Sequence, residues 1–131
     1  MKALTNIKSV LLGLFLTIAI SLSAQDFTGI GNAMQSGSAS SLSKYFDGNV
    51  EVTIIYTGAV YSKSQAEMVI KNFFTSNSPK SYKVVHNGDS GSGAKFQIGE
   101  LQTSGGTYRT YVYAKDKNGT YLIQEIRIEK N

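Results

Sequence analysis

The stretch from Tyr61 to Phe74 predicts an amphipathic helix with a defined start and end. Ser62 and Gln65 have the spacing of a capping box, in which each side chain bonds to the backbone N–H of the other residue. Apolar residues then recur at intervals of three and four, on one helical face: Ala66, Val69, Ile70, Phe73 and Phe74. Pro79 follows closely and indicates a helix end. We therefore expect a helix over residues 62–75 with one face packed on a core.

After this helix, apolar and polar residues alternate with the period of two that is typical of strands. Turn residues at Gly88–Gly93, Ser104–Gly106 and Lys117–Gly119 divide this part into four strands. Before the helix, alternation over residues 50–56 predicts one more strand. Apolar spacing predicts helices over residues 26–35 and 39–46. The order helix, helix, strand, helix and four strands predicts an α+β fold. The N-terminal helices and the one amphipathic helix pack on a curved, mostly antiparallel sheet.

Residues 1–24 have the pattern of an export signal. Lys2 and Lys8 precede an apolar segment of about 13 residues, and small residues lead up to Ala24. A helix needs about 20 residues to span a membrane, so this segment is too short for an anchor. We expect cleavage after Ala24 or one residue earlier, and a periplasmic or secreted product. The mature chain, residues 25–131, is then a single domain without a membrane span.

Cysteine usage and charge exclude several classes of protein. The chain has no cysteine and a formal net charge of +4, so disulfides and thiolate metal sites are excluded. The charge falls to about +2 without Lys2 and Lys8, which is too small and too evenly spread to indicate nucleic-acid binding. One histidine and no clustered carboxylates do not supply the ligands of a zinc site. We expect no metal and no cofactor.

Several short segments of the sequence carry a resemblance to known proteins. They are Leu42–Phe46, Tyr61–Ala66, Asn72–Phe74, His86–Gly88, Phe96–Gly99 and Ile126–Glu129. On these segments and the order of elements, the chain resembles the nuclear transport factor 2-like (cystatin-like) superfamily. Within it, the mature chain resembles a family of small secreted bacterial proteins with no assigned function. The resemblance implies a cone, with helices covering the concave side of a bent sheet. The superfamily hosts isomerases, dehydratases, ligand carriers and assembly modules, so function must be argued from the site.

Strand alternation places five polar side chains toward the inside of the predicted cone: Tyr56, His86, Glu100, Tyr108 and Gln124. Burying an amide without a partner costs about 1–3 kcal/mol. These groups therefore either pair with one another or line a pocket. A pocket between the helix over 62–75 and the sheet would make the protein a carrier or receptor for a small apolar ligand.

His86 is the only histidine and so the one side chain expected to titrate near neutral pH. Glu100 on the neighbouring strand could orient it as a general base, which would give an isomerase-type or dehydratase-type enzyme. The alternative is a hydrogen-bonded histidine at the end of a strand. The resemblance implies an aspartate base for isomerases and paired histidines for dehydratases. Because the mature aspartates have the pattern of cap or turn residues and the chain has one histidine, no catalytic residue is assigned.

The opposite face of the predicted sheet collects five residues that would form an interface: Gln97, Tyr111, Tyr113, Tyr121 and Ile123. We expect Gly99 to let Tyr111 lie across it. Charged side chains surround this set, and aromatic residues ringed by charge are typical of protein interfaces. Tyrosine is also a good strand former, so solvated strand tyrosines are the alternative. We expect an exported, non-enzymatic module that forms a homodimer or docks on an envelope protein through this outer face.

Overall fold

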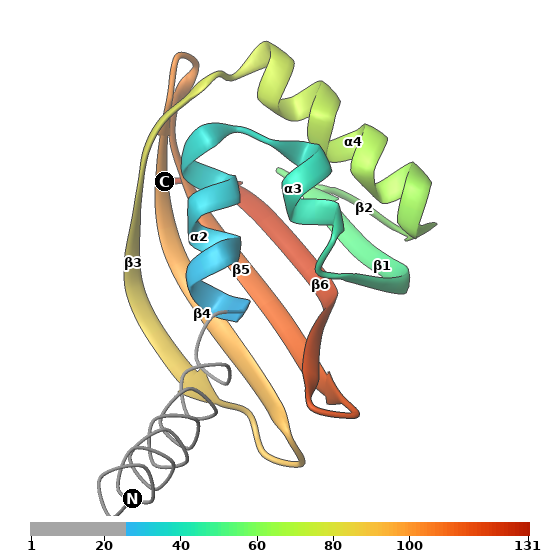
Figure 1. Cartoon of the computed structure of the whole chain (residues 1–131). Helices are drawn as coiled ribbons and strands as arrows, with labels where there is room; N and C mark the ends of the chain where they lie inside the picture. Colours follow the sequence, from blue (N-terminus) through green and yellow to red (C-terminus); the bar gives the residue numbers. More distant parts are fainter. Residues whose placement is uncertain (1–25) are drawn as a thin grey trace, which may run out of the picture.

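A computed structural model describes residues 26–131, and the predicted export signal lies outside them. In this range three helices, α2 (Asp26–Ser36), α3 (Ala39–Ser43) and α4 (Lys63–Ser76), cover one face of a six-stranded sheet (Figure 1). The strands are β1 (Phe46–Ile54), β2 (Thr57–Ser62), β3 (Pro79–Asp89), β4 (Ala94–Thr103), β5 (Gly106–Lys117) and β6 (Thr120–Lys130). The predicted α+β class is confirmed.

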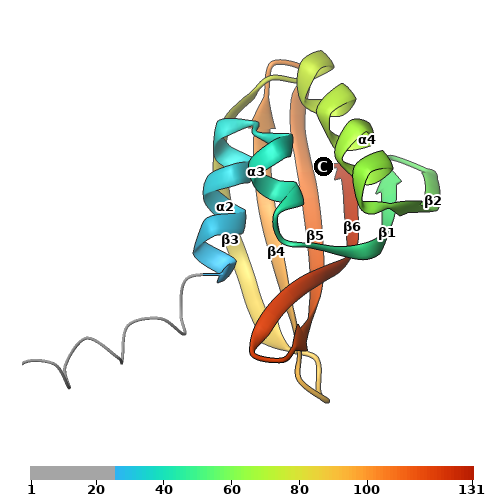
Figure 2. The same cartoon turned by 45° about the vertical axis from the view of Figure 1, so that its right-hand side comes forward.

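The sheet has the strand order β2-β1-β6-β5-β4-β3. Every neighbouring pair is antiparallel except β1 and β6, which run parallel. The long strands β3 to β6 bend together, and the helices lie in the hollow of the bend (Figure 2). We call the side that faces the helices the inner face, and the opposite side the outer face. Within residues 26–131, the helices are all too short or too polar to cross a membrane.

Helix α4 begins and ends within one residue of its predicted bounds. The Ser62 side chain accepts a hydrogen bond from the Gln65 backbone N–H at 3.3 Å, and the Gln65 side chain accepts one from the Ser62 N–H at 3.3 Å. This is the predicted capping box. At the other end, the backbone N–H of Asn77 donates to the Phe73 carbonyl at 2.8 Å. The predicted apolar face is the buried one, at Ala66, Ile70, Phe73 and Phe74.

Phe73 joins α4 to the inner face of the sheet. Its ring meets that of Tyr108 edge to face, with the centroids 5.0 Å apart. Tyr108 in turn donates from its hydroxyl to Asn77 Oδ1 at 3.0 Å, beyond the end of the helix. Together with the buried Ile70 and Phe74, these side chains pack in the space between α4 and the sheet.

Strand β2 is absent from the predicted order of elements. The chain turns after Ile54, because Ile55 takes a left-handed conformation with φ 61°, and it then pairs back on β1. The predicted strand over 50–56 therefore ends at Ile54, and the residues between it and α4 form the edge strand β2. The exposed residues of β2 leave no alternation of burial to detect. The second helix is also shorter than predicted and ends at Ser43.

Strand β4 presents the opposite face to the one that the alternation predicts. Gln97, Gly99 and Leu101 are buried on the inner face, whereas Phe96 and Ile98 lie half-buried on the outer face. Because the side-chain period of a strand is two, one choice of face decides every position along it.

Strand β6 changes face in its middle. Tyr113 of β5 pairs with Glu125, but the next residue, Ala114, pairs with Ile123, so Gln124 is an extra residue in the ladder. At such a β-bulge the alternation shifts by one residue, so the residues on one flank face the side opposite to the one that a regular strand predicts. Ile126 is on the inner face, as predicted, and Ile123 is also buried there, although a regular alternation places it outside.

Candidate functional site

The structure does not bring together the five predicted pocket residues. Tyr108 is buried on the inner face under α4, as predicted. Tyr56 is 95% exposed, because it lies in the turn between β1 and β2. His86 lies on the outer face with its partner Ile98, because β3 shifts register between Val84 and His86 and leaves Val85 as an extra residue in the ladder. Glu100 lies on the outer face because β4 presents the opposite face to the one that the alternation predicts. The inward placement of Tyr56, His86 and Glu100 is therefore wrong.

Gln124 belongs to a separate polar cluster at the bulge. Its amide nitrogen donates to Asp47 Oδ2 at 2.8 Å, and the Gly48 backbone N–H donates to Asp47 Oδ1 at 2.7 Å. Lys117 Nζ lies 3.4 Å from the same carboxylate. The hydrogen bond from Gln124, then the one from Gly48 and the contact with Lys117, hold the pKa of Asp47 below its ordinary value of 3.8. This cluster ties β1 to the β5–β6 hairpin.

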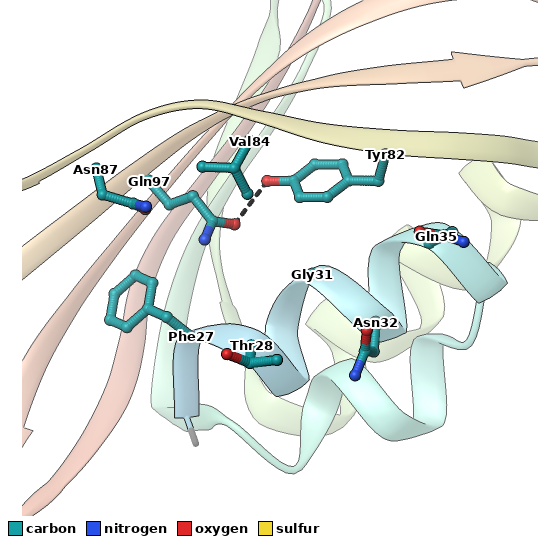
Figure 3. Close-up of a pocket in the computed structure, with 9 residues that line it drawn as sticks. All are labelled: Phe27, Thr28, Gly31, Asn32, Gln35, Tyr82, Val84, Asn87 and Gln97. Carbon is teal, nitrogen blue, oxygen red and sulfur yellow. Dashed lines mark hydrogen bonds between the residues drawn. The ribbon is translucent and has the colours of Figure 1, made fainter. Parts of the chain in front are cut away.

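A groove of about 290 Å³ lies between α2 and the strands β3 and β4 (Figure 3). Its lining residues carry no ionisable acid or base at neutral pH. They are Phe27, Thr28, Gly31, Asn32 and Gln35 from α2, and Tyr82, Val84, Asn87 and Gln97 from the strands. None of these except Gln97 is among the predicted site residues.

Gln97 forms the polar end of the groove wall. The Tyr82 hydroxyl donates a hydrogen bond to Gln97 Oε1 at 2.7 Å, and it accepts one from Thr110 Oγ1 at 3.4 Å. Burial raises the pKa of Tyr82, so its phenol stays protonated and remains a donor. Gln97 is only 2% exposed. Within residues 26–131 its amide nitrogen has no hydrogen-bond partner, and Figure 3 shows it directed into the groove.

The outer face carries no helix within the described part of the chain (Figures 1 and 2). One row of side chains across four adjacent strands alternates in charge, and we call it the charged row. It consists, in strand order, of Lys83, Glu100, Arg109 and Glu129. Next to it lies an aromatic patch, which consists of His86, Phe96, Ile98, Tyr111 and Tyr113.

The aromatic patch is ordered by ring contacts. Phe96 stacks on Tyr111 with the centroids 6.1 Å apart, and His86 lies 5.5 Å from Phe96. Arg127 Cζ lies 4.5 Å from the centroid of Tyr111, within cation–π range. The Nε atom of Arg127 is 3.7 Å from Glu125 Oε2, and this buried atom has no hydrogen bond among the described residues.

Of the five predicted interface residues, Tyr111 and Tyr113 are half-buried on the outer face. The other three lie on the inner side. Gln97 lines the groove, Ile123 is fully buried, and Tyr121 meets Phe27 of α2 with the ring centroids 5.9 Å apart. Their predicted outward orientation is wrong because of the reversed face of β4 and the bulge in β6. The ring across Gly99 is also that of Tyr82 rather than Tyr111.

Sequence reasoning misses Phe96, Ile98 and His86 as outer-face residues. A signal for Phe96 exists in Gly88, which pairs with it on β3. A Cβ at residue 88 would overlap the ring of Phe96, so the ring lies across the glycine. Large aromatic side chains are known to cover strand glycines in this way. Within residues 26–131, no three acidic, histidine or cysteine side chains are close enough to hold a metal ion.

Comparison with protein families gives one match. A family described as a domain of unknown function, DUF4783, matches residues 27–129. Among solved structures, a DUF4783 family protein from Bacteroides ovatus is 32% identical in sequence, with a TM-score of 0.76. The similarity covers 79% of this chain and 93% of that one. No curated protein matches the chain.

More distant solved structures share the fold. A nuclear transport factor 2-like protein of unknown function from Cytophaga hutchinsonii is 11% identical, with a TM-score of 0.59. The similarity covers 83% of this chain and 89% of that one. A domain of unknown function with a cystatin-like fold from Nostoc punctiforme is 9% identical, with a TM-score of 0.63, over 80% of this chain and 72% of that one. The predicted superfamily resemblance is confirmed for the fold.

Proposed function

The chain belongs to the DUF4783 family, which has no characterised role, and from this premise we propose that it is an exported, non-enzymatic protein that forms a homodimer through its outer face. The observation that carries the proposal is the aromatic patch. On a face that no described element covers, the ring of Phe96 stacks on that of Tyr111, and the guanidinium group of Arg127 lies over the ring of Tyr111. Aromatic residues and arginine are the types most enriched at interface centres.

The charged row favours a second copy of the same chain as the partner. Its charges run plus, minus, plus, minus from β3 to β6, at Lys83, Glu100, Arg109 and Glu129. A two-fold axis in the interface plane and parallel to the strands reverses the order of this row in the partner. Each cation then faces an anion. A two-fold interface must be complementary to itself in this way.

The position of His86 supports a non-enzymatic role. The imidazole lies on the outer face against the ring of Phe96, away from the groove under α2. Within residues 26–131 it has no hydrogen bond to Glu100 or another carboxylate, so the base and the orienting acid of the alternative hypothesis are not assembled. Export is supported by the residues before Ala24, where Lys2 and Lys8 precede a short apolar segment.

Sedimentation velocity over a concentration series tests the dimer. Tyr113 lies directly opposite Phe96 across β4 and β5, so Tyr113→Glu would place a charge in the desolvated centre of the interface. We expect this variant to weaken association by about 2 kcal/mol or more, as for a hot-spot residue. That loss corresponds to a dissociation constant about 30-fold higher.

Asn72→Glu is the matched control, because it places the same added charge at an exposed position of α4, on the opposite side of the sheet from the outer face. It should dimerise as the wild type does, and both variants should keep the wild-type circular dichroism. A wild-type protein that stays monomeric at the highest concentration, or a Tyr113→Glu variant that dimerises normally, would contradict the proposal.

A further inference from the structure

We propose that the groove between α2 and strands β3 and β4 binds a neutral sugar unit, which accepts a hydrogen bond from the amide of Gln97. The groove is on the inner face of the sheet, so this inference is independent of the outer-face dimer. It rests on the orientation of Gln97, on the space left by Gly31, and on the absence of charge from the lining of this groove.

A hydrogen bond from Tyr82 sets the orientation of the Gln97 amide. The Tyr82 hydroxyl donates to Gln97 Oε1 at 2.7 Å, so the oxygen is already engaged. The amide nitrogen is left to face the groove, where Figure 3 shows it beside Phe27 and Asn87. The residue as a whole is 2% exposed, and this nitrogen is not one of the side-chain atoms that are buried without a hydrogen-bond partner in residues 26–131, so it is a donor that faces the space of the groove. A ligand oxygen in the groove would satisfy this donor.

Gly31 leaves the space for such a ligand on the helix side. A glycine inside a helix costs about 1 kcal/mol relative to alanine. At Gly29 close packing explains the glycine, because a Cβ there would overlap the Tyr45 side chain. At Gly31 a Cβ would meet only the Tyr82 ring at 3.6 Å, which is ordinary contact. Packing against the protein therefore does not require glycine at residue 31. Its missing side chain keeps the groove open.

The chemistry of the lining selects an uncharged ligand. An ionised phosphate, carboxylate or ammonium group would lose its hydration here without meeting an opposite charge among the lining residues. This argues against free amino acids and short peptides, which carry charged termini. The side-chain amides of Asn32, Gln35 and Asn87 can each donate and accept, as a sugar hydroxyl does.

Size and shape also fit a sugar. The ring of Phe27 offers an apolar surface for the C–H face of a sugar ring. The groove volume of about 290 Å³ corresponds to roughly ten water molecules at about 30 Å³ each. A monosaccharide has a comparable number of non-hydrogen atoms, so the groove accommodates one sugar unit.

The test is a nuclear magnetic resonance titration of the purified protein with a panel of ligands. The panel contains neutral hexoses and N-acetylated hexosamines, with a sugar phosphate, a uronic acid and a dipeptide as charged comparisons. We expect at least one neutral sugar to bind and the charged compounds to fail. Because the proposed hydrogen bond comes from Gln97, binding should shift the side-chain amide signals of this residue.

Two leucine variants of α2 separate the groove from the rest of the surface. Gly31→Leu fills the groove, and we expect it to weaken sugar binding by about tenfold or more. Ser36→Leu is the matched control, because Ser36 lies on the same helix outside the groove lining. It should bind as the wild type does. Gly31→Ala, which makes only ordinary contact with Tyr82, provides a milder block if Gly31→Leu fails to fold.

Three results would overturn the proposal. They are the failure of every neutral sugar to bind at millimolar concentration, binding that leaves the Gln97 amide signals unmoved, and equal binding by the wild type and a folded Gly31 variant. None of these results depends on whether the outer face forms a dimer.

Discussion

The ring of Tyr82 on β3 lies directly over Gly99 on β4, so closely that a Cβ at residue 99 would overlap the phenol. The two residues are diagonal neighbours on the inner face, because Tyr82 pairs with Leu101 and Val84 with Gly99. This position lets the Tyr82 hydroxyl reach Gln97 at 2.7 Å. The glycine therefore sets both the packing of the ring and the orientation of the groove amide.

Gly99→Ala should destabilise the protein by about 1–3 kcal/mol, the usual cost of overpacking a filled site. The added methyl group would force the Tyr82 ring to move, and the ring is held between the sheet and α2. Urea denaturation measures the change in the free energy of unfolding. Gly48→Ala is the control, because a Cβ there meets nothing within 4 Å. Equal stability of the two variants would show that the Tyr82 ring is free to shift.

The sequence predicts α4 well because its signals are local. The capping box of Ser62 and Gln65 and the spacing of Phe73 and Phe74 all act within one segment, and all appear in the structure. Strand β2 could not be predicted in this way. Its side chains are mostly exposed, and its place in the sheet depends on the left-handed backbone of Ile55. That conformation is rare for a β-branched residue.

The candidate sites were predictable only where the strand face was assigned correctly. Tyr111 and Tyr113 lie on the outer face as expected, since β5 has no bulge within the stretch that alternates. Gln97 and Ile123, which were also expected on the outer face, lie on the inner face instead. Gln97 faces inward because Tyr82 and α2 cover that side of β4, and Ile123 faces inward because of the bulge at Gln124. Alternation fixes which residues share a face, but tertiary packing decides which face is buried.

Phe73→Ala should lower the free energy of unfolding by about 3–5 kcal/mol, as expected for a large aromatic residue in a core. The variant loses the edge-to-face contact with Tyr108 and leaves a cavity between α4 and the sheet. Thermal and urea denaturation measure the effect. Lys71→Ala, on the exposed side of the same helix, should change stability little. Similar losses in both variants would contradict the assignment of the buried face.

Gln124→Met should destabilise the protein most at neutral pH, because it removes the hydrogen bond that contributes most to the low pKa of Asp47. A carboxylate whose pKa is lowered by folding stabilises the folded state above its unfolded pKa. That contribution is lost as the pH falls through the folded value. For Asp47 the loss therefore begins near the ordinary value of 3.8 and continues below it.

The measurement is urea denaturation of the wild type and the variant from about pH 7 to about pH 3, since other acidic groups titrate alike in both proteins and cancel in the difference. The difference in free energy of unfolding should be largest at neutral pH and shrink in acid. Gln102→Met, the same change at an exposed position of β4, should show a small difference that does not depend on pH. A Gln124→Met difference that stays constant down to the lowest pH would mean that Gln124 supports the bulge without acting on the ionisation of Asp47.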